Sequence, residues 1–404
     1  MATNPPPSHI HRTLQPVLTR LARGFPVVTL TGPRQAGKTT LCRTTFPNHR
    51  YVSLEAPDIR LFASRDPRAF LSEFADGAIV DEVQRVPELL SYLQPLVDAD
   101  PRPGRFVLTG SETLSLGAAT AQSLAGRTAV ARLLPLSREE VRSTRFEASS
   151  LFETLWRGGY PALFSRELEV VDWLSAYLTT LVERDLRQLA QVGDLLTFQA
   201  FLGLTAGRAG SLLNMSALGA DAGVSHTTAR NWLSVLESMF LVFRLAPWHR
   251  NIGKRLVKMP KLYFWDTGLL CYLLGIRAPE QLRTHPLRGQ IFENWVVSEL
   301  AKAEYHRGRE PRMWFYRDQQ GVEIDVILEG HDGDVRLIEV KSGQTLGGDA
   351  FDGLIAGAGR WGLAADPRPS RRILVYGGDE QQRRTAAEVW PWHQVDGVGG
   401  GGAQ

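Results

Sequence analysis

The chain has 404 residues, of which 43% are hydrophobic and 22% charged, and its formal net charge is +3. Because one core rarely grows beyond about 250–300 residues, we expect several globular domains. The small net charge permits a nucleic-acid partner without arguing for one. The two cysteines, Cys42 and Cys271, exclude a disulfide scaffold and suit a reduced, cytoplasmic protein. We expect no signal peptide, and no apolar run approaches the roughly 20 residues of a membrane span.

The pattern of apolar and helical stretches predicts an α/β protein in several parts. Over residues 14–140, short apolar runs alternate with helical stretches, which is typical of a parallel sheet covered by helices on both faces. We predict a helical lid or linker over 141–208, a winged helix-turn-helix over 209–265 and a second α/β unit over 266–392. Residues 1–13 are expected to be a disordered tail and residues 393–404 a flexible one.

A phosphate-binding loop is predicted near the N-terminus, in the segment VVTLTGPRQAGKTTL. Here the pattern G-x-x-x-x-G-K-T lies between an apolar strand and a helix, where the backbone amides can point at phosphate oxygens. We expect Lys38 to reach the β- and γ-phosphates of ATP and the Thr39 hydroxyl to bind Mg²⁺. The residues predicted to contact the nucleotide in this loop are Gly32, Pro33, Arg34, Gln35, Ala36, Gly37, Lys38, Thr39 and Thr40.

An ATP site of this type also needs an acidic residue at the end of another strand. The stretch AIVDE supplies Asp81, which we expect to hold the Mg²⁺ shell, and Glu82, which we expect to polarise the attacking water. A third strand ends in VLTGS, where Thr109 or Ser111 is predicted to lie near the γ-phosphate.

An arginine from a neighbouring subunit assists hydrolysis in many NTPases. Arg127, in SLAGRTA, and Arg157, in WRGGYP, are candidates for this role. For both, an ordinary structural salt bridge is the alternative.

Residues 211–240 show a helix–turn–helix pattern. We expect a first helix over 216–222, a turn at Gly223 and a second helix capped by Ser225. Small polar and basic residues near the start of the second helix suit the reading of a DNA groove, here Thr227, Arg230 and Asn231. The basic run that follows would contact phosphates through Arg250, Lys254, Arg255, Lys258 and Lys261. The alternative is a winged helix that serves only for packing or subunit contact.

Near the C-terminus, GVEIDVILEGHDGDVRLIEVKSG predicts two strands joined by a short turn. Alternate residues share a face of a strand, which groups Glu323 and Asp325, and likewise Glu339 and Lys341. Such close carboxylates need a cation between them. We therefore predict a Mg²⁺ site held by Asp325, Glu339 and Glu293, the last from the preceding helix, with Lys341 placing or deprotonating a water. The alternative is a solvent-facing strand with cross-strand salt bridges.

Several of these segments resemble the bacterial and archaeal AAA-type P-loop ATPases whose C-terminal region is long known as a domain of unknown function. The similar stretches, within residues 14–345, are GPRQAGKTTL, YVSLEAPDIR, AIVDEVQ, VLTGS, LAGR, GGYPAL, PKLYFWDTGL, RGQIFENWVVSEL and GVEIDVILE with IEVKSG. The resemblance implies an ATPase core, a winged helix and a restriction-endonuclease-like fold of the PD-(D/E)xK type. It also implies a homo-oligomer, such as a ring, and relatives are linked to Holliday junctions. Asp325 matches the D of the nuclease pattern, and Glu339 with Lys341 matches the E-x-K.

These patterns favour a cytoplasmic protein that hydrolyses ATP with Mg²⁺ and acts on duplex or branched DNA, with a metal-dependent nuclease step in the C-terminal unit. Recognition of DNA shape fits better than recognition of sequence, because the predicted contacts are mainly to phosphate. The alternative function is a nucleotide-dependent switch or scaffold, in which the nuclease-like fold is inactive and no DNA is cut.

Overall fold

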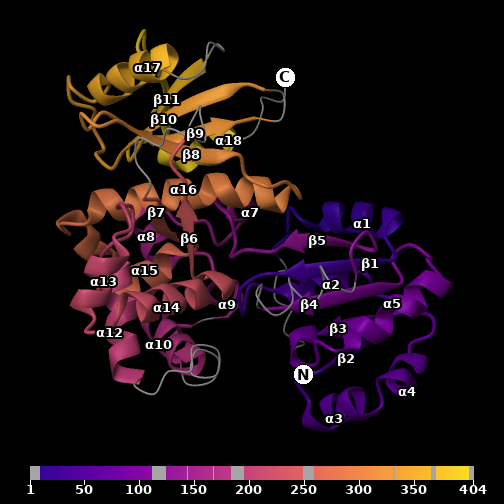
Figure 1. The fold of residues 1–404 in the computed structure, drawn as a ribbon. Helices are drawn as coiled ribbons and strands as arrows, with labels where there is room; N and C mark the ends of the chain where they lie inside the picture. Colours follow the sequence, from indigo (N-terminus) through magenta and orange to yellow (C-terminus); the bar gives the residue numbers. More distant parts are fainter. Residues whose placement is uncertain are drawn as a thin grey trace, which may run out of the picture.

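The computed structural model describes residues 10–111, 124–142, 144–166, 168–182, 195–248, 259–330, 333–364 and 370–399. The two larger sheets lie in separate parts of the molecule, and helices of the middle of the chain lie beside them (Figure 1). In these ranges, no helix is both long enough and apolar enough to cross a membrane.

The first sheet has five parallel strands in the order β2-β3-β4-β1-β5. They are β1 (Val27–Thr31), β2 (Arg50–Ser53), β3 (Ala78–Asp81), β4 (Phe106–Gly110) and β5 (Thr128–Arg132). Helices α1 (Gln15–Gly24) and α2 (Lys38–Thr45) cover one face, and α3 (Pro57–Arg65), α4 (Pro67–Ser72) and α5 (Leu89–Ala99) cover the other. Strands β1 and β4 are buried along their whole length, as strands covered on both faces must be. The predicted parallel α/β core is confirmed.

The middle of the chain is helical, as predicted. Its helices are α7 (Arg138–Val141), α8 (Leu151–Arg157), α9 (Ala162–Ser165), α10 (Val170–Thr180), α12 (Leu195–Ala206), α13 (Met215–Asp221) and α14 (His226–Ser238). The Ser225 hydroxyl accepts a hydrogen bond from the backbone N–H of Thr228 at 3.0 Å and so caps α14. Strands β6 (Val242–Leu245) and β7 (Lys261–Phe264) then pair antiparallel.

A mixed six-stranded sheet, in the order β12-β13-β11-β10-β9-β8, forms the second α/β unit. Its strands are β8 (Met313–Arg317), β9 (Glu323–Glu329), β10 (Val335–Lys341), β11 (Ser370–Tyr376), β12 (Gln382–Arg383) and β13 (Glu388–Pro391). The predicted hairpin is confirmed, because β9 and β10 pair antiparallel with Val326 opposite Ile338. Helix α16 (Arg288–His306) packs on one face, and α17 (Asp352–Ala364) lies on the other (Figure 1).

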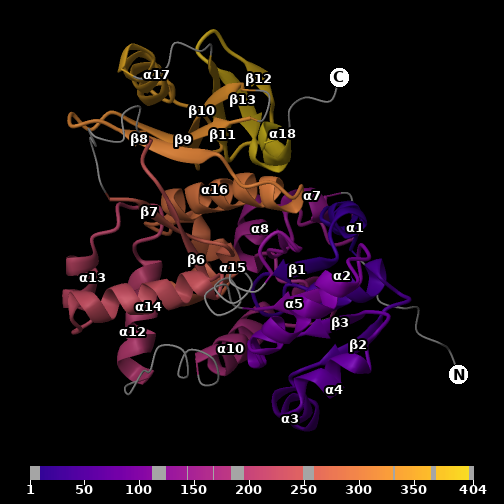
Figure 2. The same cartoon turned by 45° about the vertical axis from the view of Figure 1, so that its right-hand side comes forward.

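Helix α16 lies between the C-terminal sheet and the rest of the protein (Figure 2). It has 19 residues and is the longest of the helices in the described ranges. It contacts β10 on one side, and β5, β7 and α15 (Thr267–Leu273) on the other. Nearly all of its side chains after Glu293 are buried, because both sides of the helix are covered.

Both predicted tails are ordered in part. Arg12 is only 5% exposed, so the chain is packed from before residue 13 onward. At the other end, α18 (Val395–Gly399) buries Val395 and Val398 against α16. The tail assignments were wrong over residues 10–13 and 393–399, because short segments that pack against a distant element carry little periodicity of their own. Residues 1–9 and 400–404 lie outside the described part of the chain.

Candidate functional site

The phosphate loop follows β1 and ends where α2 begins at Lys38. A Cβ at Gly32 would clash with the backbone carbonyl oxygen of Leu133, so only glycine fits where the loop leaves the sheet. Gly37 has a φ of +92°, a left-handed conformation that glycine adopts without strain. These two glycines bend the loop at the carboxyl edge of the sheet, where open α/β sheets bind ligands.

The side chain of Lys38 points back into the phosphate loop. Its ammonium donates hydrogen bonds to the carbonyl oxygens of Gly32 at 2.8 Å and Pro33 at 2.9 Å. Burial lowers the pKa of Lys38, while the nearby carboxylates of Glu82 and Asp81 oppose that shift. The side chain is thus held at the place where it would meet phosphate oxygens.

Asp81, at the end of β3, accepts hydrogen bonds from three hydroxyl groups. Thr39 donates at 3.0 Å and Tyr51 at 2.7 Å, both to Oδ2, and Thr109 donates to Oδ1. Burial and the bond to Asp81 raise the pKa of Tyr51 to about 12. Tyr51 was missed in the sequence because it comes from β2, 30 residues earlier.

Glu82 has a left-handed backbone conformation with a φ of +57°, which is uncommon for a residue other than glycine. Its Oε2 accepts a hydrogen bond from the Ser111 hydroxyl at 3.1 Å and another from the Gln84 amide. The backbone N–H of Glu82 lies 3.3 Å from the Thr109 hydroxyl. Thr109 and Ser111 therefore support the acidic pair, and a place for Thr109 or Ser111 near the γ-phosphate stays a prediction.

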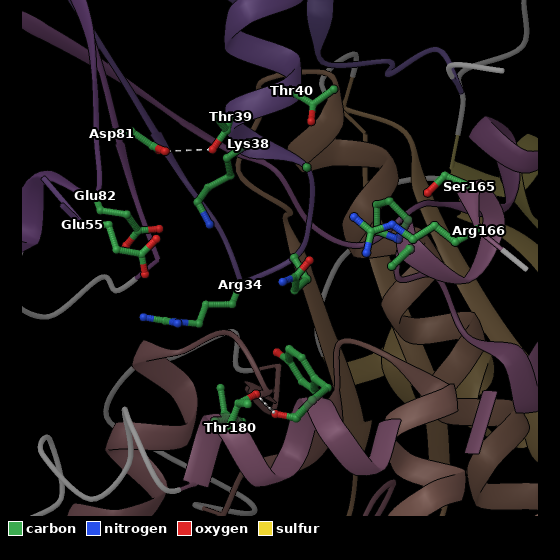
Figure 3. A pocket seen from close by; sticks show the side chains of 16 residues that line it. Arg34, Lys38, Thr39, Thr40, Glu55, Asp81, Glu82, Ser165, Arg166 and Thr180 are labelled. Carbon is green, nitrogen blue, oxygen red and sulfur yellow. Dashed lines mark hydrogen bonds between the residues drawn. The ribbon is translucent and has the colours of Figure 1, made fainter. Parts of the chain in front are cut away.

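A pocket of about 500 Å³ opens above the loop. One wall holds the loop with Asp81 and Glu82, and the other comes from α9 and α10 with Arg166 and Thr180. Figure 3 shows Arg166 extending toward the pocket from the side opposite to the acidic pair. No local pattern distinguishes this exposed arginine from the many others in the sequence, since only the fold brings α9 to the loop.

The donor set beside the loop fits Mg²⁺. The Thr39 hydroxyl and the Asp81 carboxylate lie 3.0 Å apart, and Glu82 lines the same pocket. Mg²⁺ prefers hard oxygen donors and keeps several waters, so it needs only one or two protein ligands next to phosphates.

The two candidate arginines lie elsewhere. Arg127 makes a two-pronged ion pair with Asp98, at 2.5 and 2.9 Å. It precedes β5, at the amino edge of the sheet, whereas the phosphate loop lies at the carboxyl edge, so the whole length of β1 separates the two. Arg157 pairs with Glu153 on its own helix. Neither lines the pocket of its own chain, and a role for Arg127 in a neighbouring copy stays a prediction.

The predicted metal site of the C-terminal unit holds a lysine. The Lys261 ammonium lies 2.9 Å from Glu293 Oε1 and 3.9 Å from Asp325 Oδ1, and it also pairs with Glu323. Lys261 is 3% exposed. Burial alone would lower its pKa, but Glu293, Asp325 and Glu323 surround the ammonium and raise it. The prediction that Lys261 contacts phosphates as part of a basic run is wrong, because its ammonium is buried among these acids.

Glu339 and Lys341 pair with each other at 2.6 Å, and Asp325 Oδ2 accepts the backbone N–H of Val340 at 2.9 Å. Burial raises the pKa of Asp325 well above its ordinary value, and Glu293 and Glu339 raise it further. Within the residues the structure describes, no three acidic, histidine or cysteine side chains converge as metal ligands would. The predicted Mg²⁺ set of Glu293, Asp325 and Glu339 is therefore not assembled, because Lys261 already supplies the cation.

Apart from Lys261, the residues predicted to contact DNA divide into two groups. Thr227, Arg230 and Asn231 are exposed on α14, opposite its buried stripe. The basic residues of the following run, Arg250, Lys254, Arg255 and Lys258, lie outside the described part of the chain.

Fold and loop together define a nucleotide-binding protein of the AAA class. The family described as an AAA domain matches residues 24–142. Two domains of unknown function, DUF8612 and DUF4143, match residues 148–280 and 288–395.

Two mycobacterial proteins are similar over most of the chain. They are the uncharacterized proteins Rv2008c of Mycobacterium tuberculosis and Mb2031c of Mycobacterium bovis, each 36% identical over 316 residues, which is 77% of this chain and 69% of the relative. The chain belongs to the same family as these proteins. Among solved structures, the Walker-type ATPase PABY2304 of Pyrococcus abyssi is similar with a TM-score of 0.45 and 16% identity, over 67% of this chain and 99% of that one.

Proposed function

We propose that the chain binds ATP with Mg²⁺ in the pocket above the phosphate loop and hydrolyses it. The observation that carries the proposal is the meeting of Lys38, Thr39 and the acidic pair at one edge of the sheet. The family match to an AAA domain supports the same activity.

Each residue of the site has a distinct task in this proposal. Lys38 would exchange its two carbonyl partners for β- and γ-phosphate oxygens, and Thr39 with Asp81 would hold Mg²⁺. The metal supplies charge neutralisation at the phosphates. Glu82 would orient a water and accept its proton, with Ser111 and Gln84 fixing the carboxylate. Arg166 faces the pocket and adds positive charge from the side of α9.

Replacing Lys38 with Ala is expected to weaken ATP binding by about tenfold to a hundredfold. A hydrogen bond to a charged group contributes about 1.5–3 kcal/mol, and each change of about 1.4 kcal/mol is a factor of ten. Titration with a fluorescent ATP analogue, with and without Mg²⁺, measures the affinity. Equal affinity for the analogue in the wild type and in Lys38→Ala would contradict the assignment of this loop to ATP binding.

We further propose that α13, α14 and the β6–β7 pair form a winged helix that contacts DNA. Helix α14, which Ser225 caps, supports this proposal. Its polar side chains near the N-terminus are exposed, and its apolar stripe is buried. The basic run at 250–258 follows it in the sequence.

Binding to labelled duplex and to a four-way junction at low salt tests the DNA contact. We expect the affinity to fall linearly with salt on logarithmic axes, and Arg230→Ala to weaken binding. Arg68→Ala, which removes an exposed arginine from α4, is the matched control and should bind as the wild type does. If no DNA binds at low salt, the second candidate function, a nucleotide-dependent switch or scaffold, replaces this one.

We propose that the C-terminal unit keeps a restriction-endonuclease-like shape without cutting DNA. In support, the Lys261 ammonium lies 2.9 Å from Glu293 of α16 and 3.9 Å from Asp325 of the β9–β10 hairpin, so a lysine occupies the place predicted for the metal. The unit would then serve to hold α16 and β7 in place.

A further inference from the structure

Arg12 lies directly behind the phosphate loop. Its Nη1 donates a hydrogen bond to the carbonyl oxygen of Ala36 at 2.7 Å, and its Nη2 donates to the carbonyl oxygen of Leu134 at 2.6 Å. Its Nε donates to Glu140 Oε1 at 3.0 Å. Arg12 is 5% exposed, and all three nitrogen atoms of its guanidinium donate hydrogen bonds within the protein.

The contact with Ala36 fixes the orientation of one peptide group of the loop. In a trans peptide, the C=O and the following N–H point in opposite directions. Because the Ala36 carbonyl points at Arg12, the N–H of Gly37 points away from Arg12, toward the pocket that Gly37 lines. An inward-pointing amide at this position is what a phosphate oxygen needs.

Glu140 holds Arg12 in place. Its side chain is fully buried and accepts hydrogen bonds from the backbone N–H groups of Thr13 at 2.9 Å and Ser137 at 3.0 Å. Burial opposes ionisation, but the charge of Arg12 and these bonds outweigh it and lower the pKa of Glu140 to about 2. The carboxylate is therefore charged and paired with the guanidinium.

The other side of Glu140 faces His306, at the end of α16. His306 Nε2 accepts the backbone N–H of Leu134 at 3.2 Å, and Nδ1 lies 3.5 Å from Glu140 Oε1. Burial lowers the pKa of His306 to about 4, so the ring is neutral at pH 7 and carries its proton on Nδ1, facing Glu140. The loop thus connects to a helix of the C-terminal unit through Leu134, whose carbonyl oxygen accepts from Arg12 and whose N–H donates to His306, while the neutral ring also packs beside Glu140.

We propose that Arg12 is a positioning residue for nucleotide binding, which sets the Ala36–Gly37 peptide of the phosphate loop, and that Glu140 and His306 extend this support to α16. The inference rests on the proposed binding of ATP in this loop. It assigns a role to a residue in the segment that precedes the AAA-domain match at residues 24–142.

The test is the affinity of Arg12→Lys for a fluorescent ATP analogue with Mg²⁺, together with KM and kcat. Lysine keeps the charge but has no planar fork, so it cannot hold Ala36, Leu134 and Glu140 together. We expect about a tenfold loss of affinity and a similar rise in KM, with a smaller change in kcat.

Arg105→Lys is the matched control. Arg105 is also buried, at 8% exposure, and donates to the carbonyl oxygens of Ala75 and Leu96, but at the amino edge of the sheet. Both variants should lose similar thermal stability, and only Arg12→Lys should lose nucleotide affinity. A folded Arg12→Lys protein with affinity within about twofold of the wild type would overturn the inference.

If Arg12→Lys does not fold, Glu140→Gln tests the same inference. It removes the charge that holds the guanidinium but keeps the shape of the side chain, and we expect a loss of affinity of about threefold or more. Unchanged affinity in this variant would also overturn the inference. A wild-type protein that binds no ATP would instead refute the proposed function itself, so the two failures are distinguishable.

Discussion

Replacing Lys261 with Met is expected to lower the free energy of unfolding of the C-terminal unit by about 3 kcal/mol, since it removes the ammonium that Glu293, Glu323 and Asp325 share. The loss falls at the low end of the range for buried pairs, because these carboxylates keep part of their side-chain surface exposed to water. Urea unfolding, with hydrogen exchange followed in β9 and β10, measures the change.

A divalent cation should partly restore the stability of the Lys261→Met variant. With Lys261 gone, Mg²⁺ or Mn²⁺ can neutralise the same carboxylates, whereas the wild type should gain nothing. Arg371→Met, which removes a half-exposed cation paired with Glu388 in the same unit, is the control and should change stability by less than about 1 kcal/mol. Unchanged stability of Lys261→Met would show that the acids need no cation. Cutting of a labelled junction by the wild type with Mn²⁺ would contradict the inactive nuclease fold.

Glu82→Gln is expected to bind ATP as the wild type does and to lose about a hundredfold or more in kcat. The amide keeps the size of the side chain and its hydrogen-bond contacts, but it cannot accept a proton from water, and general bases contribute about 10²–10⁴-fold. Steady-state phosphate release and the affinity for the ATP analogue, measured on the same protein, separate the two effects.

Glu88→Gln provides the control for the change in charge, because Glu88 is exposed at the start of α5 and is not part of the pocket. It should hydrolyse ATP at the wild-type rate. If Glu82→Gln also did so, the water would be activated by another group.

The features that the sequence predicted well are local. The phosphate loop and the acidic pair could be recognised because each occupies a few consecutive residues at the end of an apolar strand. The cap at Ser225 and the β9–β10 hairpin follow from short-range rules as well. In the structure the loop and the acidic pair meet at one edge of the sheet, with Thr39 bonded to Asp81.

The features that were missed come from contacts between distant segments. Arg12 meets Glu140 across 128 positions, and Lys261 meets Glu293 across 32. The spacing of acids in the C-terminal hairpin predicted a metal ion among them, whereas the structure places a lysine there. The spacing could not show that the cation would be a lysine from β7, because only the packing of β7 against α16 brings that side chain to the acids.

The most direct test of the central claim is the release of phosphate from ATP by the purified 404-residue chain, with Mg²⁺ and with EDTA, beside Lys38→Ala. We expect turnover that requires Mg²⁺ and that is lost in the variant. Binding of the ATP analogue without any Mg²⁺-dependent turnover, or equal turnover in both proteins, would contradict the assignment of this site as an ATPase.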